Sequence, residues 1–288
     1  MNISSLPNTL RFGSDKDLFW IEFDRRIGYY TMDNNHYHSQ YEIYYLFQGE
    51  RNYFIKDSTY RVHSGDLVLV DSNAIHKTSD MLAPNHERIV LNFAPMFFNE
   101  FTQTEKELLI SPYQDGNPHI RLNLQEKMYV ETQLASLLSE IVNQPPGYQL
   151  YIRNVAVELL LFTARNILKR ESEANDKLSP IQHKVTGIVR HINLHYGDPL
   201  QLDSIAKQFF ISKSHLSRIF KLLTGFGFTE YVNITRVKEA ERLLKDTKLS
   251  VTVVSELCGF ENFSHFGKVF KKLSGLSPRA YRKHKGVL

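Results

Sequence analysis

The chain lacks the features that mark secreted and membrane-embedded proteins. It has a single cysteine, Cys258, among 288 residues, which excludes an intramolecular disulfide and fits a reducing compartment. No apolar run approaches the length of about eighteen residues that a transmembrane helix needs. The sequence begins without the basic segment and apolar stretch of a secretory signal. We therefore expect a cytoplasmic protein with no membrane contact.

Acidic residues are scarce in the C-terminal part of the chain. Residues 180–288 contain 18 Lys and Arg against 8 Asp and Glu, a net charge of +10. The other 179 residues contain 17 Lys and Arg against 23 Asp and Glu, a net charge of −6. This split indicates that only the C-terminal part faces a polyanion, although charge alone would also fit a solvated basic surface. A chain of this length suits two domains.

A repeated segment adds to the charge pattern. Residues 214–225 read SHLSRIFKLLTG, and residues 264–275 read SHFGKVFKKLSG, with six of twelve positions identical. Tyr231 and Tyr281 extend the match at the same offset of fifty residues. A repeat of this kind indicates one supersecondary unit used twice. An amphipathic, basic and glycine-ended helix in two copies predicts two DNA readers.

Each copy has the pattern of a helix-turn-helix, in which a buried support helix precedes a reading helix with an exposed outer face. In the first copy residues 202–208 form the predicted support, and Ser212 is a favourable N-cap for the reading helix. In the second copy residues 251–258 form the support, and Gly259 provides the turn. Residues 229–246 predict a connecting helix. The outer faces, which we expect to contact DNA, carry Lys213, Ser214, Ser217, Arg218 and Lys221 in the first copy, and Asn262, Ser264, Lys268 and Lys271 in the second.

Residues 184–285 resemble the DNA-binding domain of the AraC/XylS transcription regulators. The resemblance covers both repeats, the connecting helix and the closing GLSPRAYR at 275–282. It implies that the first reading helix makes the stronger base contacts, and the guanidinium of Arg218 suits guanine. The second copy departs from the family pattern at Gly267 and Lys268, and its lysines suit phosphates better than base edges. It further implies a cupin-like N-terminal sensor and recruitment of RNA polymerase in an activator.

The remainder of the chain predicts a sheet followed by helices. Up to about residue 95, short runs rich in Tyr, Phe, Ile and Val alternate with turn signals, as in an antiparallel sandwich or barrel. From 124 to 170 the apolar period becomes helical, with a break at Pro145, Pro146 and Gly147. The second of these helices is apolar on more than one face, which fits packing within the domain or contact with a second subunit.

The predicted fold class is therefore α+β: an N-terminal antiparallel β-barrel of the cupin type with following helices, then an all-α C-terminal domain with two helix-turn-helix units. The predicted domains are residues 1–170 for effector binding and dimerisation, a polar linker at 171–179, and residues 180–288 for DNA binding.

The N-terminal part holds candidate sensor residues. The HxHxxxE spacing of His36, His38 and Glu42 and the distance from Gly65 to His76 resemble the two cupin motifs. The candidate effector-binding residues are His36, His38, Glu42, Tyr44 and His76. Three imidazoles and a carboxylate also form a competent set for a transition metal. The AraC/XylS resemblance favours barrel lining without a metal, so we expect no metal and no cofactor. A third interpretation makes the histidines ordinary strand residues.

These patterns favour a DNA-binding transcription regulator and not an enzyme. The expected partners are double-stranded DNA, a small effector, RNA polymerase and a second copy of the chain. The AraC/XylS resemblance implies that the effector is a sugar or a sugar derivative. A metal-dependent cupin enzyme with a DNA-binding tail, or an architectural DNA binder without a sensor, are the alternatives.

Overall fold

The protein is described from a computed structural model that covers residues 6–29, 37–80, 84–114, 117–170 and 180–285. The chain divides into two compact units. Unit 1 comprises Met1–Lys56 and Tyr60–Lys177, and unit 2 comprises Leu178–Leu288 with the short segment Asp57–Thr59. The predicted linker at 171–179 lies outside the described residues. Among the described residues we find no helix with the length and hydropathy that crossing a membrane requires.

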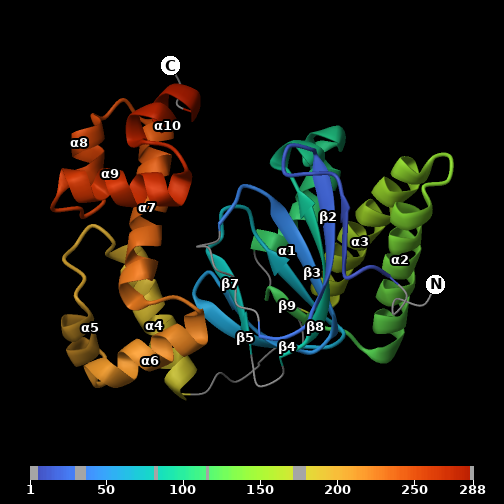
Figure 1. Ribbon diagram of the computed structural model, residues 1–288, viewed down its shortest axis with the longest axis horizontal. Helices are drawn as coiled ribbons and strands as arrows, with labels where there is room; N and C mark the ends of the chain where they lie inside the picture. The colour runs from blue at the N-terminus through green and yellow to red at the C-terminus, as the bar shows by residue number, and fades with distance from the viewer. Residues whose placement is uncertain (1–5, 30–36, 81–83, 115–116, 171–179, 286–288) are drawn as a thin grey trace. The chain divides into compact units, whose positions relative to one another are not determined.

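Unit 1 contains two antiparallel sheets (Figure 1). The larger sheet has, in spatial order, β1 (Thr9–Phe12), β2 (Phe19–Arg26), β8 (His86–Phe93), β3 (Tyr41–Gln48), β6 (Asp66–Val70) and β9 (His119–Arg121). The smaller sheet has β5 (Ser58–His63), β4 (Glu50–Ile55) and β7 (His76–Asp80). Gly49, with a φ of 99°, turns the chain from β3 of one sheet into β4 of the other, a conformation that glycine adopts without strain.

The larger sheet is covered on both faces because successive side chains of a strand point to opposite sides. In β3, Ile43 and Tyr45 join a core with the helices that follow the sheet. The alternate residues, Tyr44 and Leu46, join a second core with Tyr53 and other residues of the smaller sheet. The central strands therefore read as near-continuous apolar runs, and the space between the two sheets is where polar side chains can be held.

Helices of unit 1 pack on the outer face of the larger sheet. They are the 3-10 turn η2 (Pro95–Glu100), α1 (Gln103–Gln114), α2 (Leu124–Asn143) and α3 (Tyr148–Arg170). Asn123 begins α2 with a capping box to Glu126, and Gln144 in a left-handed conformation ends it. The predicted break at Pro145–Gly147 separates α2 from α3. In α3, Ile152, Leu159 and other apolar residues are buried in the sheet core.

The prediction of an antiparallel sheet domain followed by helices is confirmed, whereas closure into a barrel is not observed among the described strands. The described strands pair within a six-stranded and a three-stranded sheet. Strand β9 was not predicted. It comes after α1 in the chain and pairs with β6 through Ile120 and Leu67, and this pairing depends on residues more than fifty positions apart.

The described residues 180–285 of unit 2 form helices and the turns between them. The helices are α4 (Pro180–Leu194), α5 (Leu202–Gln208), α6 (Lys213–Thr224), α7 (Phe228–Asp246), α8 (Val251–Leu257), α9 (Phe263–Ser274) and α10 (Pro278–Lys285). Figure 1 shows the α5–α6 and α8–α9 pairs at opposite ends of α7. At one end the ring of Phe220 contacts Phe228 and Tyr231 of α7. At the other, Val237, Ala240 and Leu244 of α7 form a core with α8 and α9.

The repeated helices α6 and α9 begin and end in the same way. The side chains of Ser212 and Asn262 accept hydrogen bonds from the backbone N–H of His215 and His265, which satisfies orphan donors of the first turn. Gly225 and Gly275, each with a φ of 76°, end the two helices. Left-handed glycine at this position is the common helix stop, so the repeat encodes both boundaries.

Candidate functional site

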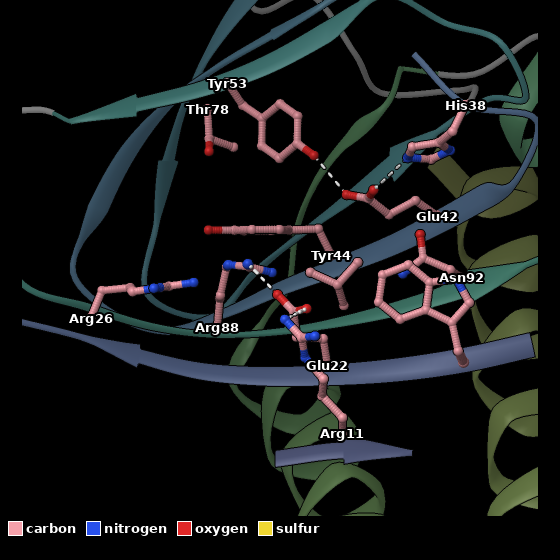
Figure 2. A pocket seen from close by; sticks show the side chains of 12 residues that line it. Arg11, Glu22, Arg26, His38, Glu42, Tyr44, Tyr53, Thr78, Arg88 and Asn92 are labelled. Atoms are coloured by element: carbon pink, nitrogen blue, oxygen red, sulfur yellow. Dashed lines mark hydrogen bonds and ion pairs between the residues drawn. The ribbon is translucent and has the colours of Figure 1, made fainter. Parts of the chain in front are cut away.

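A cavity of about 240 Å³ lies in unit 1 on the face of the larger sheet that the smaller sheet covers (Figure 2). The strand period explains its lining, because alternate residues of β2, β3 and β8 point into it. Its walls are formed by Arg11, Trp20, Glu22, Arg26, His38, Glu42, Tyr44, Tyr53, Thr78, Arg88, Val90 and Asn92. Polar and aromatic side chains make up almost all of this lining, which suits a small polar ligand better than an apolar one.

The floor of the cavity carries a network of ion pairs. Arg88 donates to Glu22 at 2.7 Å and to Asp24 at 3.0 Å. Nη2 of Arg11 lies 3.0 Å from Oε2 of Glu22, and Nη2 of Arg26 lies 2.8 Å from Oδ2 of Asp24. Burial raises the pKa of Asp24, but its hydrogen bonds and the charges of Arg88 and Arg26 outweigh burial and lower it. Each of the three guanidinium groups is therefore held in place by an ion pair with Glu22 or Asp24.

Three buried donors at this cavity have no hydrogen-bond partner among the described residues. They are the indole N–H of Trp20, the hydroxyl of Tyr44 and the side-chain amide nitrogen of Asn92. Tyr44 and Asn92 are almost fully buried, and burial raises the pKa of Tyr44 to about 12, so its hydroxyl keeps its proton at neutral pH. Burying an unpaired donor costs about 1–3 kcal/mol, and a ligand that offers acceptor oxygens would remove this cost.

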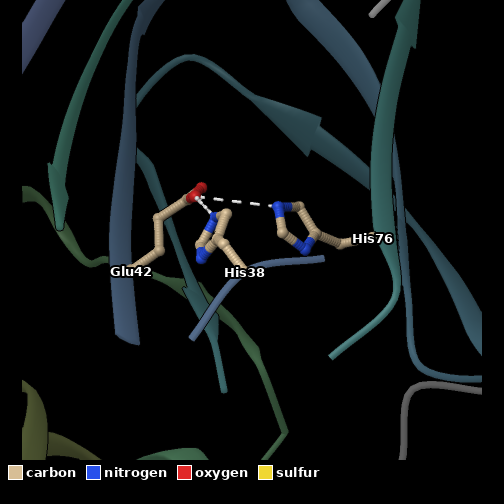
Figure 3. A group of neighbouring side chains, drawn as sticks. All are labelled: His38, Glu42 and His76. Carbon is tan, nitrogen blue, oxygen red and sulfur yellow. Dashed lines mark ion pairs between the residues drawn. The ribbon is translucent and has the colours of Figure 1, made fainter. Parts of the chain in front are cut away.

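A cluster of His38, Glu42 and His76 lies at the edge of the cavity (Figure 3). Oε2 of Glu42 is 3.4 Å from Nε2 of His38 and 3.7 Å from Nε2 of His76. The hydroxyl of Tyr53 donates to Oε1 of Glu42 at 2.7 Å. Burial raises the pKa of Glu42, but His38, His76 and Tyr53 together lower it to about 2. Glu42 is therefore an anion held by three side chains.

The structure brings together four of the five proposed effector residues. His38, Glu42 and Tyr44 line the cavity, and His76 lies behind Glu42, whereas His36 falls outside the described residues. Trp20 and Arg88 also lie in the wall. Sequence reasoning missed Arg11, Glu22, Arg26 and Asn92. Charged and amide residues at alternate positions of otherwise apolar strands were the available signal, since a buried face rarely carries them without a role.

The second candidate site is the outer face of α6. The five residues proposed for DNA contact on this helix, Lys213, Ser214, Ser217, Arg218 and Lys221, are all exposed, while Leu216 and Phe220 are buried. Polar residues and cations thus share one face of a helix whose other face is packed. A helix of this kind can enter the major groove without loss of its core contacts.

The equivalent face of α9 carries fewer groups that read bases. Ser264, Lys268 and Lys271 are exposed, as is Asn262. Asn262 was proposed to lie on the outer face, but it is the N-cap, and its side-chain oxygen accepts from His265 N at 2.9 Å. Gly267 stands at the position of Ser217, so α9 presents mainly lysines.

Two family models match the chain. The AraC-like ligand binding domain matches residues 22–160, which contain most of the cavity lining. The helix-turn-helix domain matches residues 205–284, which contain both helix pairs. Together the two matches cover most of the described parts of both units.

Known proteins resemble the chain over most of its length. An uncharacterized HTH-type transcriptional regulator of Bacillus subtilis is 24% identical over 266 residues, which cover 89% of this chain and 82% of that protein. The HTH-type transcriptional activator RhaS of Escherichia coli is 26% identical over 252 residues, 86% of each chain. Among solved structures, ToxT from Vibrio cholerae with a bound unsaturated fatty acid is 16% identical, with 94% of this chain and 97% of that chain covered and a TM-score of 0.40.

Proposed function

Because the chain belongs to the AraC/XylS family of DNA-binding transcription regulators, with an N-terminal ligand-binding domain, we propose that its effector is a sugar or a sugar derivative. The observation that carries this proposal is the set of three buried donors, from Trp20, Tyr44 and Asn92, at one cavity. Hydroxyl and ring oxygens of a sugar would accept from all three. In this proposal the cavity is a receptor site and has no catalytic role.

The size and charge of the cavity support a small neutral ligand. Its volume of about 240 Å³ is below the range of about 300–1,000 Å³ that drug-sized ligands occupy. Since Arg88, Arg11 and Arg26 are already paired with Glu22 and Asp24, the cavity offers neutral donors more readily than a free positive charge. A long fatty acid would leave these donors unpaired.

A thermal-shift screen tests the effector class. Neutral monosaccharides and a fatty acid are compared on the full chain, and we expect a monosaccharide to raise the melting temperature because it binds only the folded state. Tyr44→Phe removes one donor and little volume, so it should weaken the shift for the same sugar. A shift with the fatty acid alone, or an equal shift in Tyr44→Phe, contradicts the proposal.

In the C-terminal unit we propose two helix-turn-helix readers, the pairs α5–α6 and α8–α9. Arg218, Ser214 and Ser217 would contact base edges, while lysines of both helices would hold phosphates. Helix α7, with 19 residues, is about 28 Å long. This length supports placement of the two readers near the spacing of about 34 Å between successive major grooves on one side of DNA.

Selection of binding sites from random duplexes tests this arrangement. If both pairs read DNA, the enriched sequences should contain a strongly defined element and, about one helical turn away, a weakly defined one. Enrichment of a single isolated element would mean that only one helix pair reads DNA. The absence of any enriched sequence would overturn sequence-specific binding.

The remaining parts of the proposal follow from this role. We place effector binding and dimerisation in residues 1–170 and DNA binding in residues 180–288, joined by 171–179.

The exposed side chains of Leu124 and Met128, one turn apart on α2, support a homodimer contact. An activator of this kind would act in the cytoplasm and recruit RNA polymerase. Light scattering should show a dimer that Met128→Lys weakens, and a wild-type monomer would exclude the contact.

A further inference from the structure

Helix α7 joins the two helix pairs of unit 2, and a second connection between them runs through the side chain of Arg236. Arg236 lies near the middle of α7, and it donates from Nε to the carbonyl oxygen of Tyr196 and from Nη2 to that of Asp198, both at 2.8 Å. Tyr196 and Asp198 belong to the segment between α4 and α5, which leads directly into the first pair. Hydrogen bonds from a charged donor are roughly twice as strong as those between neutral groups. Arg236 therefore holds this segment firmly against α7.

The same guanidinium group contacts the second helix pair. Its Cζ lies 5.7 Å from the centroid of the Phe260 ring, a distance at which a cation and an aromatic face attract each other. Phe260 lies in the turn between α8 and α9, and the centroid of its ring is 5.0 Å from that of Phe266 on α9. One side chain of α7 thus contacts the segment that leads into the first pair and the turn of the second.

The backbone between α4 and α5 also packs directly against the second pair. A Cβ atom on Gly197 would lie 2.9 Å from the carbonyl oxygen of Leu257, at the end of α8. In the reverse direction, a Cβ atom on Gly259 would lie 2.8 Å from the carbonyl oxygen of Tyr196. The absence of a side chain on both glycines allows this close approach of two backbones. The side chain of Tyr196 packs against the core that α7, α8 and α9 share, so this segment belongs to the packing of both pairs.

We propose that Arg236 is a positioning residue that fixes the orientation of the two helix pairs relative to each other. A single helix sets the distance between its ends but can bend, whereas a second connection restricts both bending and rotation. A fixed orientation makes the chain selective for the spacing of two DNA elements, because both readers bind at once only where the geometry allows it. This selectivity for spacing rests on the proposed function, whereas the fixed orientation does not.

Distances between spin labels on the full chain test the fixed orientation without DNA. Leu222→Cys and Lys272→Cys place labels at equivalent exposed positions of α6 and α9, and an excess of unlabelled chain removes signals between two copies. Cys258 is buried, and burial raises the pKa of its thiol to about 12, so it does not take the label. We expect one narrow distribution of label distances with Arg236 present and a broader or shifted distribution in Arg236→Gln.

Binding to DNA tests the selectivity for spacing. The two elements obtained by site selection are placed at their selected spacing and with one base pair inserted, which moves the second element by about 3.4 Å and about 35°. We expect the insertion to weaken wild-type binding at least about 10-fold. In Arg236→Gln, binding at the selected spacing should be about 10-fold weaker, and the insertion should cost less than about 3-fold. A duplex that contains the strong element alone should bind the variant and the wild type equally.

Three further variants separate positioning from charge and from folding. Arg236→Lys keeps the positive charge but replaces the planar fork of donors with a compact ammonium group, so it should resemble Arg236→Gln. Lys245→Gln removes an exposed cation near the end of α7 and should keep the spacing penalty of the wild type. Gly197→Ala leaves Arg236 in place but forces the segment away from Leu257, so it should also broaden the label distances. If circular dichroism shows that Arg236→Gln fails to fold, Gly197→Ala serves in its place.

Label distances that stay the same in Arg236→Gln and Gly197→Ala overturn the positioning role. The role is also overturned if Arg236→Gln keeps the spacing penalty of the wild type, or if it loses as much affinity for the strong element alone. Label distances that broaden in Arg236→Gln, together with wild-type binding that tolerates the inserted base pair, support the fixed orientation and overturn the proposed pair of readers. The positioning role and the proposed function therefore succeed or fail separately.

Discussion

The reading helices of the two pairs in unit 2 both begin at a polar N-cap and end at a left-handed glycine, but the pairs differ at the turn between their helices. In the second pair the turn contains Gly259, with a φ of 75°, and in the first it contains Phe210, with a φ of 51°. A Cβ atom on Gly259 would lie 2.8 Å from the carbonyl oxygens of Tyr196 and Gly197. Phe210 is 89% exposed. In the second pair the left-handed residue must be glycine, because backbone carbonyl oxygens pack against it. In the first pair the side chain at this position is exposed to solvent, so phenylalanine is tolerated.

The pairs also differ on the face that we assign to DNA. Helix α6 carries Ser217 and Arg218 where α9 carries Gly267 and Lys268. A guanidinium can donate two parallel hydrogen bonds to guanine, whereas an ammonium acts as a compact charge. The duplication therefore kept the elements that hold the helices in place and let the reading surface change. We expect one copy to provide specificity and the other to provide affinity.

The largest expected effect is on folding. Gly259→Ala should lower the free energy of unfolding by about 3 kcal/mol, because the left-handed φ is strained for alanine and the added Cβ meets two carbonyl oxygens. Urea unfolding followed by circular dichroism measures the change. The matched control is Gly267→Ala, where the added Cβ has nothing within 4 Å, and a helical alanine should raise stability by about 0.5–1 kcal/mol. Equal effects of the two variants would refute the contrast between the turns.

Removal of the guanidinium in the first copy should come next. Arg218→Ala should cost about 1–3 kcal/mol of binding free energy on a selected site and relax discrimination at one base pair. Lys268→Ala, in the second copy, should weaken all duplexes alike and reduce the salt slope by about one unit. Fluorescence anisotropy at several salt concentrations measures both. Equal loss on selected and scrambled DNA in Arg218→Ala would remove its role in base reading.

The contrast between the pairs also shows which features a sequence can reveal. The repeat, the caps Ser212 and Gly225, and the buried stripe of α6 are local patterns with a helical period, so they were predicted from the sequence. The support helix at Leu202–Gln208 was predicted with the bounds that the structure has. Asn262 was assigned to the outer face of α9, although it is the N-cap of that helix. An N-cap residue and an outer-face residue of the first turn are both polar and lie close together in the sequence, so the pattern alone does not separate them.

The cavity in unit 1 was only partly predictable. His38 and Glu42 share one local motif, and their closeness follows from it. Arg88, Asn92 and Trp20 meet them through pairing of β2, β8 and β3, and such pairing depends on contacts between distant parts of the chain. The sequence shows that these strands exist, but the order in which they pair decides which alternate residues share a face.

A double exchange in the second copy should sharpen the comparison. Gly267→Ser with Lys268→Arg gives α9 the two outer residues of α6, and the open space at Gly267 accepts the side chain. We expect about 1 kcal/mol of new discrimination at the weak element, since one good bidentate contact provides about 1–3 kcal/mol. Repeated site selection with the variant measures it. An unchanged weak element would mean that α9 lies too far from the bases for its residue types to matter.

The smallest expected effect is at the turn of the first copy. Phe210→Gly should raise the free energy of unfolding by about 0.5 kcal/mol, because relief of a left-handed conformation, about 1–2 kcal/mol, exceeds the entropy that glycine adds to the unfolded chain. The exposed ring loses little packing, and the backbone oxygen still accepts from Nζ of Lys184 at 3.2 Å. Urea unfolding of Phe210→Gly and Phe210→Ala distinguishes the causes. Alanine keeps the strained φ, so an equal gain in both variants would trace the effect to the exposed ring and leave the two turns equivalent.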